Sequence, residues 1–207
     1  ILYEWCPNLL ELNVPTLVKT GDELDIGDSF MCNYGAGVSH PSLKTIDCSG
    51  FKDATSIGDR FLSYCKTIKT INLSALTNIK KIGDYFLDMR GGLGEPSIVD
   101  LDLSSFTNLE EIGGSFLCMC KNLENLKFPS STTIITLNEN FLADCHSLKS
   151  IDLSAFNKVT SIGEWFLYNC ESLTSVDLSA SSSLTEINHS FLANDTSLTT
   201  VDLRGCT

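Results

Sequence analysis

Nine cysteines are the residues of this 207-residue chain best suited to chemistry, as disulfide partners, metal ligands or nucleophiles. Their number is odd, and most recur at fixed places in a repeated pattern rather than as pairs. The five that share one column are Cys6, Cys65, Cys120, Cys145 and Cys170. Such a column is typical of a packing role, in which a small thiol turns inward and donates weakly to a loop carbonyl. We therefore expect buried structural thiols rather than disulfides.

The other cysteines occupy different places in the pattern. Cys48 falls at a strand core position and is expected to be buried, whereas Cys32 and Cys118 share a column that we expect to be exposed. The nearest approach to a zinc ligand set is Cys118, Cys120, Cys145 and His146. A zinc site needs four ligands that converge on one point. Because this spacing follows from the repeat itself, we expect no metal and no other cofactor.

Acid–base or nucleophilic catalysis would need histidine or paired carboxylates in one place. The three histidines, His40, His146 and His189, fall in different regions of the chain. A pair such as Asp152 and Asp177 resembles a hydrolase dyad, but the same aspartate recurs five times along an open face. We read that recurrence as patterning and expect no enzyme activity.

The composition narrows the classes of partner. The formal net charge of −12 argues against nucleic acid and against a polybasic contact with a membrane, and it favours a cationic protein partner. The apolar runs are too short for a membrane-spanning helix. The chain begins with Ile1 rather than methionine, so we expect it to be part of a longer protein.

A repeat organises these residues. The box I-G-x-x-F-L places phenylalanine at Phe30, Phe61, Phe86, Phe116, Phe141, Phe166 and Phe191. The unit is 25 residues long, with insertions of about six and five residues near 33–40 and 89–96. A unit of this size cannot bury its apolar face alone, but stacked copies can, which predicts a solenoid.

Each unit contains two apolar segments. The segment Leu148–Ser154 reads L-K-S-I-D-L-S and alternates with period two, as a half-buried strand does. The segment from Val159 to Cys170 has apolar residues at spacings of three and four, which predicts a short extended piece followed by a helical turn.

These combined motifs, C-x-x-L-x-x-I-x-L followed by I-G-x-x-F-L-x-x-C, resemble the BspA-like, or Treponema-type, leucine-rich repeat across the whole chain. The resemblance implies an α/β repeat solenoid, right-handed, with a parallel concave β-sheet and short helical turns on its convex side. We expect one domain over residues 1–207, with seven to eight units. The family also implies a surface-exposed or secreted protein, several of whose members bind proteins of a host or a neighbouring cell.

The outward column of the predicted strands carries the candidate binding residues Asp47, Asp102, Asp152, Asp177 and Asp202. Neighbouring carboxylates about 4.8 Å apart in water repel by roughly 0.9 kcal/mol before salt screening, so something must offset the repulsion. One explanation is solvent, Lys127 between two of the aspartates, and bonding of each aspartate to the hydroxyls of the next turn. The other explanation is a basic segment of a partner lying along the column.

The two insertions fall at one edge of the solenoid, where insertions often mark a binding side, although neutral variation in exposed loops explains them as well. Their candidate contact residues are Tyr34, His40 and Arg90. The sequence thus predicts a protein-binding module at the cell surface or secreted. The alternative is a structural scaffold subunit of a larger intracellular assembly, which unpaired cysteines would suit.

Overall fold

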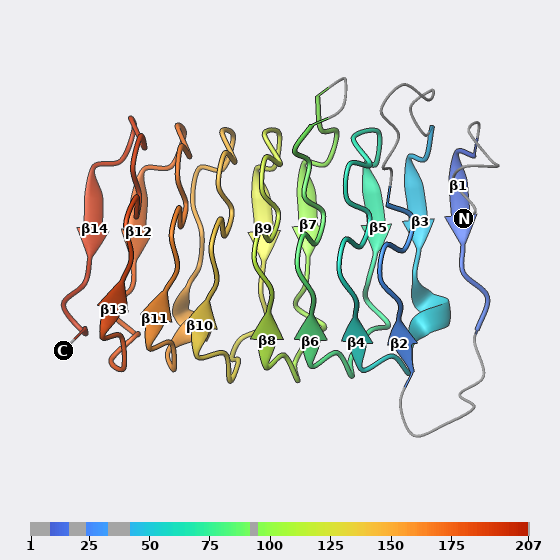
Figure 1. Ribbon diagram of the computed structural model, residues 1–207, viewed down its shortest axis with the longest axis horizontal. Helices are drawn as coiled ribbons and strands as arrows, with labels where there is room; N and C mark the ends of the chain where they lie inside the picture. Colours follow the sequence, from blue (N-terminus) through green and yellow to red (C-terminus); the bar gives the residue numbers. More distant parts are fainter. Residues whose placement is uncertain (1–8, 17–23, 33–41, 92–94, 207) are drawn as a thin grey trace.

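The computed structural model describes residues 9–16, 24–32, 42–91 and 95–206. It is a solenoid of stacked coils in which most coils contribute two short parallel strands (Figure 1). The three-residue strands are β1 Glu11–Asn13, β3 Thr45–Asp47, β5 Thr70–Asn72, β7 Asp100–Asp102, β9 Asn125–Lys127, β12 Ser175–Asp177 and β14 Thr200–Asp202. The two-residue strands are β2 Asp25–Ile26, β4 Ser56–Ile57, β6 Lys81–Ile82, β8 Glu111–Ile112, β10 Thr136–Leu137, β11 Ser161–Ile162 and β13 Glu186–Ile187. We call these sets the three-residue row and the two-residue row.

Strands in each row pair in parallel with the equivalent strand of a neighbouring coil, so Val176 lies opposite Val201. The three-residue row is divided into the sheets β1-β3-β5, β7-β9 and β12-β14, and the two-residue row into β2-β4-β6-β8 and β10-β11-β13. In β7, β9 and β12 the central residue is buried and its two neighbours are exposed. The predicted alternation of the repeat is thereby confirmed.

One predicted strand is wrong. The segment Leu148–Ser154 has the same pattern as its neighbours, yet no strand is assigned there, and a 3₁₀ helix, η2, begins at its end over Ser154–Phe156. A second short 3₁₀ helix, η1, spans Ser49–Phe51. In the preceding coil, Phe128 stands where other described coils have leucine, cysteine or valine, and it packs edge-on against Phe156 with ring centroids 4.8 Å apart. These rings lie at the junction where strand pairing stops after β9.

A ladder of phenylalanine rings forms the centre of the core. The box phenylalanines of successive coils stack with centroids 5.3 to 5.6 Å apart and interplanar angles of 7 to 17°. Phe61, Phe86, Phe116, Phe141 and Phe166 are at most 1% exposed. Since stacked rings attract one another, the ladder stabilises the stacking of the coils as well as burying apolar area.

The predicted helical turn after each box is not a helix. The segment Arg60–Tyr64 forms turns in which alternate residues are left-handed, with φ of 60° at Arg60, 52° at Leu62 and 63° at Tyr64. For residues other than glycine, this backbone conformation costs free energy. The alternation allows these N–H groups to serve both neighbouring coils: Leu62 donates to the preceding coil at the Phe30 carbonyl, and Tyr64 to the following coil at Asp88. Hydrogen bonds between coils thus offset the local strain.

The cysteine column has the predicted packing role. Cys65, Cys120, Cys145 and Cys170 are fully buried, and the Sγ of Cys145 donates to the Leu117 carbonyl at 3.3 Å. Equivalent bonds run from Cys65 to the Met31 carbonyl, from Cys120 to that of Leu87 and from Cys170 to that of Leu142. Cys6 lies outside the described residues.

The remaining cysteines give one correction. Cys48 is buried as expected. Cys118, which we expected to be exposed, is 2% exposed, and Cys32 is half-buried. Burial raises the pKa of Cys48 and of Cys118 to about 12, and that of Cys32 to about 11. These thiols are therefore poor nucleophiles at neutral pH, because the thiolate is the reactive form.

Candidate functional site

The candidate site is the outward face of the three-residue row, together with the coil between β9 and β12 that has no strand of its own. In most coils an aspartate stands at the end of this segment. Each of these aspartates also serves the turn that follows it: Asp152 Oδ1 accepts a hydrogen bond from the Ser154 N–H at 2.9 Å. The same bond is made by Asp47, Asp102, Asp177 and Asp202 to the residue two positions on. The recurring aspartate therefore has a structural task, the Asx-turn, which was one of the two explanations of the column.

Departures from the pattern support this reading. Asn72 takes the aspartate position in β5 and accepts from the Ser74 N–H in the same way, at 3.2 Å. In the coil that has Lys127 at this position, the residue two places on is Pro129, which has no N–H to donate. The turn bond therefore needs only one side-chain oxygen, and the amide oxygen of asparagine can replace a carboxylate oxygen.

Several of the carboxylates have partners besides their own turn. Asp102 lies 3.7 Å from the Lys127 ammonium, which confirms that this lysine relieves one stretch of the column. Asp47 accepts from the Asn72 amide at 3.0 Å. Asp202 is bound by the Arg204 guanidinium, which lowers the pKa of Asp202 to about 2.

The two aspartates that remain are Asp152 and Asp177. Both are exposed, and neither forms an ion pair with another described residue. The Ser154 hydroxyl, followed by the Ser154 N–H, lowers the pKa of Asp152, so this carboxyl is ionised at neutral pH. Asp177 lies in register with Asp202. Asp47 likewise forms no ion pair with a described residue, and Arg204 acts electrostatically on Asp177 without forming an ion pair with it. Asp152 and Asp177 are thus two exposed carboxylates in neighbouring coils without an ion-pair partner among the described residues.

Two hollows indent the same face on either side of Lys127. One, of about 560 Å³, is lined by residues of β5, β7 and β9, including Ile71 and Asp100. The other, of about 390 Å³, is lined by residues of β9 and the following coil, including Phe128 and Asp152. They lie where the three-residue row changes from one sheet to the next. The sequence analysis did not predict either hollow, although Pro129 is a signal that pairing stops there.

Of the three contact residues predicted in the edge loops, the structure describes only Arg90. Tyr34 and His40 lie outside the described residues. Arg90 is held within the chain: its guanidinium binds the Asp88 carboxylate at 2.8 Å and donates to the Ser115 hydroxyl at 2.7 Å. The Arg90 side chain is 35% exposed and that of Asp88 only 1%. Burial raises the pKa of Asp88, while Arg90 holds its anionic form in place. A role for Arg90 in partner contact stays a prediction.

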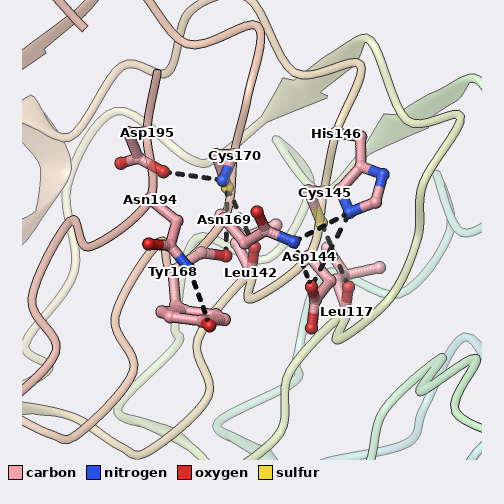
Figure 2. Close-up of polar contacts among 10 residues, drawn as sticks. All are labelled: Leu117, Leu142, Asp144, Cys145, His146, Tyr168, Asn169, Cys170, Asn194 and Asp195. Atoms are coloured by element: carbon pink, nitrogen blue, oxygen red, sulfur yellow. Dashed lines mark hydrogen bonds and ion pairs between the residues drawn. The ribbon is translucent and has the colours of Figure 1, made fainter. Parts of the chain in front are cut away.

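The two described histidines, His146 and His189, contact different polar side chains. His146 lies 3.6 Å from Asp144 and 3.2 Å from the Asn169 amide, while His189 lies 3.1 Å from Glu164 (Figure 2 shows the first group). Over the described ranges, histidine, cysteine and acidic side chains form no group of three that could hold a metal ion. In the same ranges, no helix is long and apolar enough to cross a membrane.

The comparison with known families agrees with this geometry. The model of the BspA type leucine rich repeat region matches six copies, over residues 36–100 and 93–206. The chain belongs to this family. The parallel strands and the scarcity of helix are consistent with a leucine-rich-repeat solenoid.

No curated protein matches the sequence. Among solved structures, a leucine rich cell surface protein from Faecalibacterium prausnitzii A2-165 is 18% identical with a TM-score of 0.42, and the alignment covers 97% of this chain and 61% of that one. A leucine-rich repeat protein from Bacteroides ovatus ATCC 8483 is 17% identical with a TM-score of 0.39, covering 96% and 70%. This BspA-type chain therefore spans less than two thirds of the first of these proteins.

Proposed function

We propose that this BspA-type chain is a non-enzymatic protein-binding module that holds a basic segment of a partner protein along the three-residue row. Asp152 and Asp177 carry the proposal, because they are exposed carboxylates in neighbouring coils without an ion-pair partner among the described residues. Lysine or arginine side chains of a partner would supply the missing cations. The net charge of −12 would speed the approach of such a partner.

The hollows beside Lys127 make this face concave in two places, where a flat sheet would offer no pocket. Ile71 and Phe128 contribute apolar surface to them next to the charged residues. In our proposal they receive the apolar side chains of the partner, while the column of Asp47, Asp102 and Asp202 completes the acidic face. The edge loops with Tyr34, His40 and Arg90 extend the contact. We place the module at the cell surface or outside the cell, as family membership favours.

The test compares the proteins captured at physiological salt by the wild type and by the double variant Asp152→Asn/Asp177→Asn. Mass spectrometry identifies the captured proteins. Asn72 shows that asparagine keeps the turn bond, so the double variant removes charge without removing the cap. The matched control is Glu110→Gln/Glu186→Gln, which removes two exposed charges away from the three-residue row. We expect a basic partner to bind the wild type and the control and to be lost from the double variant. Equal capture by all three proteins would refute the proposal.

The structural-scaffold alternative rests on the cysteines, because every described one is a free thiol, as is usual inside cells. Burial weakens this point, since thiols with a raised pKa resist oxidation even in an oxidising compartment. Brief protease treatment of intact cells separates the two functions. Loss of the protein would place it at the surface, and full protection would favour the intracellular scaffold.

A further inference from the structure

The cysteine column changes chemistry at Asp195, which stands four residues after Phe191, where earlier coils have a thiol. In those coils the thiol makes two kinds of contact. The Cys170 Sγ donates to the Leu142 carbonyl at 3.3 Å, and the Cys145 N–H, one coil back, lies close enough to the Cys170 sulfur to lower its pKa. A thiol both donates and accepts, so it satisfies both neighbours.

Asp195 satisfies only one of them (Figure 2). Its Oδ1 accepts from the Cys170 N–H at 2.6 Å, as a column sulfur does. Its Oδ2 is buried and has no hydrogen-bond partner among the described residues. An ionised carboxylate can only accept hydrogen bonds, and a buried acceptor without a donor is costly.

The repeat indicates which carbonyl a hydrogen bond from Asp195 Oδ2 would reach. Where no insertion intervenes, a column thiol donates to the leucine carbonyl 28 positions earlier, as Cys145 does to Leu117 and Cys170 to Leu142. The same offset from Asp195 leads to Leu167. A protonated carboxyl could make this bond from Oδ2 while Oδ1 keeps the Cys170 N–H.

We propose that Asp195 is a protonation switch for the final described coil. As a neutral acid it reproduces the thiol's two hydrogen bonds and holds this coil to the one before it. As a carboxylate it leaves a half-buried charge with one oxygen that has no donor, and the coil loosens. This role is separate from the proposed binding function and does not depend on it.

The surroundings of Asp195 suit such a switch. Burial raises its pKa to about 7, and the Cys170 N–H lowers it by less. The titratable group that responds to its charge is the Cys170 thiol, on which the Asp144 carboxyl also acts. Burial and then the Asp195 charge raise the pKa of Cys170, so this thiol stays neutral over the range in which Asp195 titrates.

The direction of the pH effect follows from the raised pKa of Asp195. Its value in the unfolded chain is near 3.8, so folding favours the protonated form. The stabilisation is fully present below about pH 3.8 and is lost as the pH rises through about 7. Acidification from pH 8 to pH 6 should therefore tighten the final coil.

The experiment follows the Asp195 carboxyl by ¹³C NMR of the 207-residue chain, with Asp195→Asn to assign the resonance. Amide exchange of Asn169 and Leu192, whose N–H groups join this coil to the one before it, is measured at pH 6 and pH 8. After correction for intrinsic exchange, we expect protection in the wild type to fall about tenfold at pH 8, since one unit above a pKa the charged form dominates tenfold. Asp195→Asn and Asp195→Cys, which can both donate and accept, should show no such change.

The control variant is Asp152→Asn, which removes an exposed carboxylate and should leave the pH dependence of protection as in the wild type. A carboxyl that titrates near pH 4, or equal wild-type protection at pH 6 and pH 8, would overturn the proposal. The wild-type titration and exchange data decide the question even where a variant fails to fold.

Discussion

The phenylalanine ladder predicts that the same substitution has very different costs in the middle and near the end of the solenoid. Phe141 is 1% exposed and contacts four rings, those of Phe116, Phe128, Phe156 and Phe166. Phe191 is only partly buried and stacks on Phe166 at 5.6 Å. The two residues hold the same place in the repeat, so each is a control for the other.

For Phe141→Ala we expect a loss of about 3–5 kcal/mol, the usual cost of removing a buried phenylalanine, and the upper part of this range because stacked rings add about 0.5–1.5 kcal/mol each. For Phe191→Ala we expect less than half of that loss, because the site is open to water and has fewer partners. In a chain of this size, a loss of 4 kcal/mol lowers Tm by roughly 8–16 °C.

Urea unfolding followed by circular dichroism measures both variants. Because each coil contacts only its neighbours, a gap at Phe141 should also weaken the coupling between the two halves and lower the apparent m-value, whereas Phe191→Ala should leave it unchanged. Equal losses for the two variants, or a loss below 1 kcal/mol for Phe141→Ala, would refute the view that the ladder is the continuous core of this protein.

Three further predictions concern the polar contacts. The Cys145 thiol should react with a thiol reagent only after unfolding, because it is buried and its pKa is raised, and fast labelling of the native chain at this site would contradict that. Asp152→Ala should cost about 0.5–1.5 kcal/mol by removing the turn bond, while Asp152→Asn should cost almost nothing, as compared by thermal melting; equal losses would disprove the capping role. Arg90→Met should cost about 3 kcal/mol by leaving the Asp88 carboxylate buried and uncompensated, and the double variant Arg90→Met/Asp88→Ala should recover part of the loss; additive losses would show that the pair is not coupled.

Much of the fold could be predicted because the repeat states it many times. A single L-x-x-I-D-L segment is ambiguous, but its recurrence every 25 residues predicts stacked parallel strands, and the family match and the strand pairing confirm them. The cysteine column was interpretable for the same reason, since a thiol at one place in several coils indicates packing. Cys118 was wrongly expected to be exposed: it is buried, as are Ser63, Asp88 and Ala143 at the same place in other coils.

The left-handed turns after each box were beyond local reasoning. Leucine disfavours positive φ, and spacings of three and four residues indicate a helix. The conformation of Leu62, Leu87 and Leu117 is stable only because the coils on both sides supply hydrogen-bond partners. That information lies in the stacking and not in any one unit.

The sequence by itself determined the period, the parallel strands, the buried phenylalanine and cysteine columns, and the outward position of the aspartates, because a repeated pattern shows which face of the coil each residue takes. Only the tertiary structure decided which aspartates are already paired, where the face is hollowed beside Lys127, and that Asp195 leaves one buried oxygen without a donor. These features depend on contacts between coils at distances of a few ångströms. A residue that departs from the repeat, such as Phe128 or Asp195, changes these contacts without changing the pattern that predicts the fold.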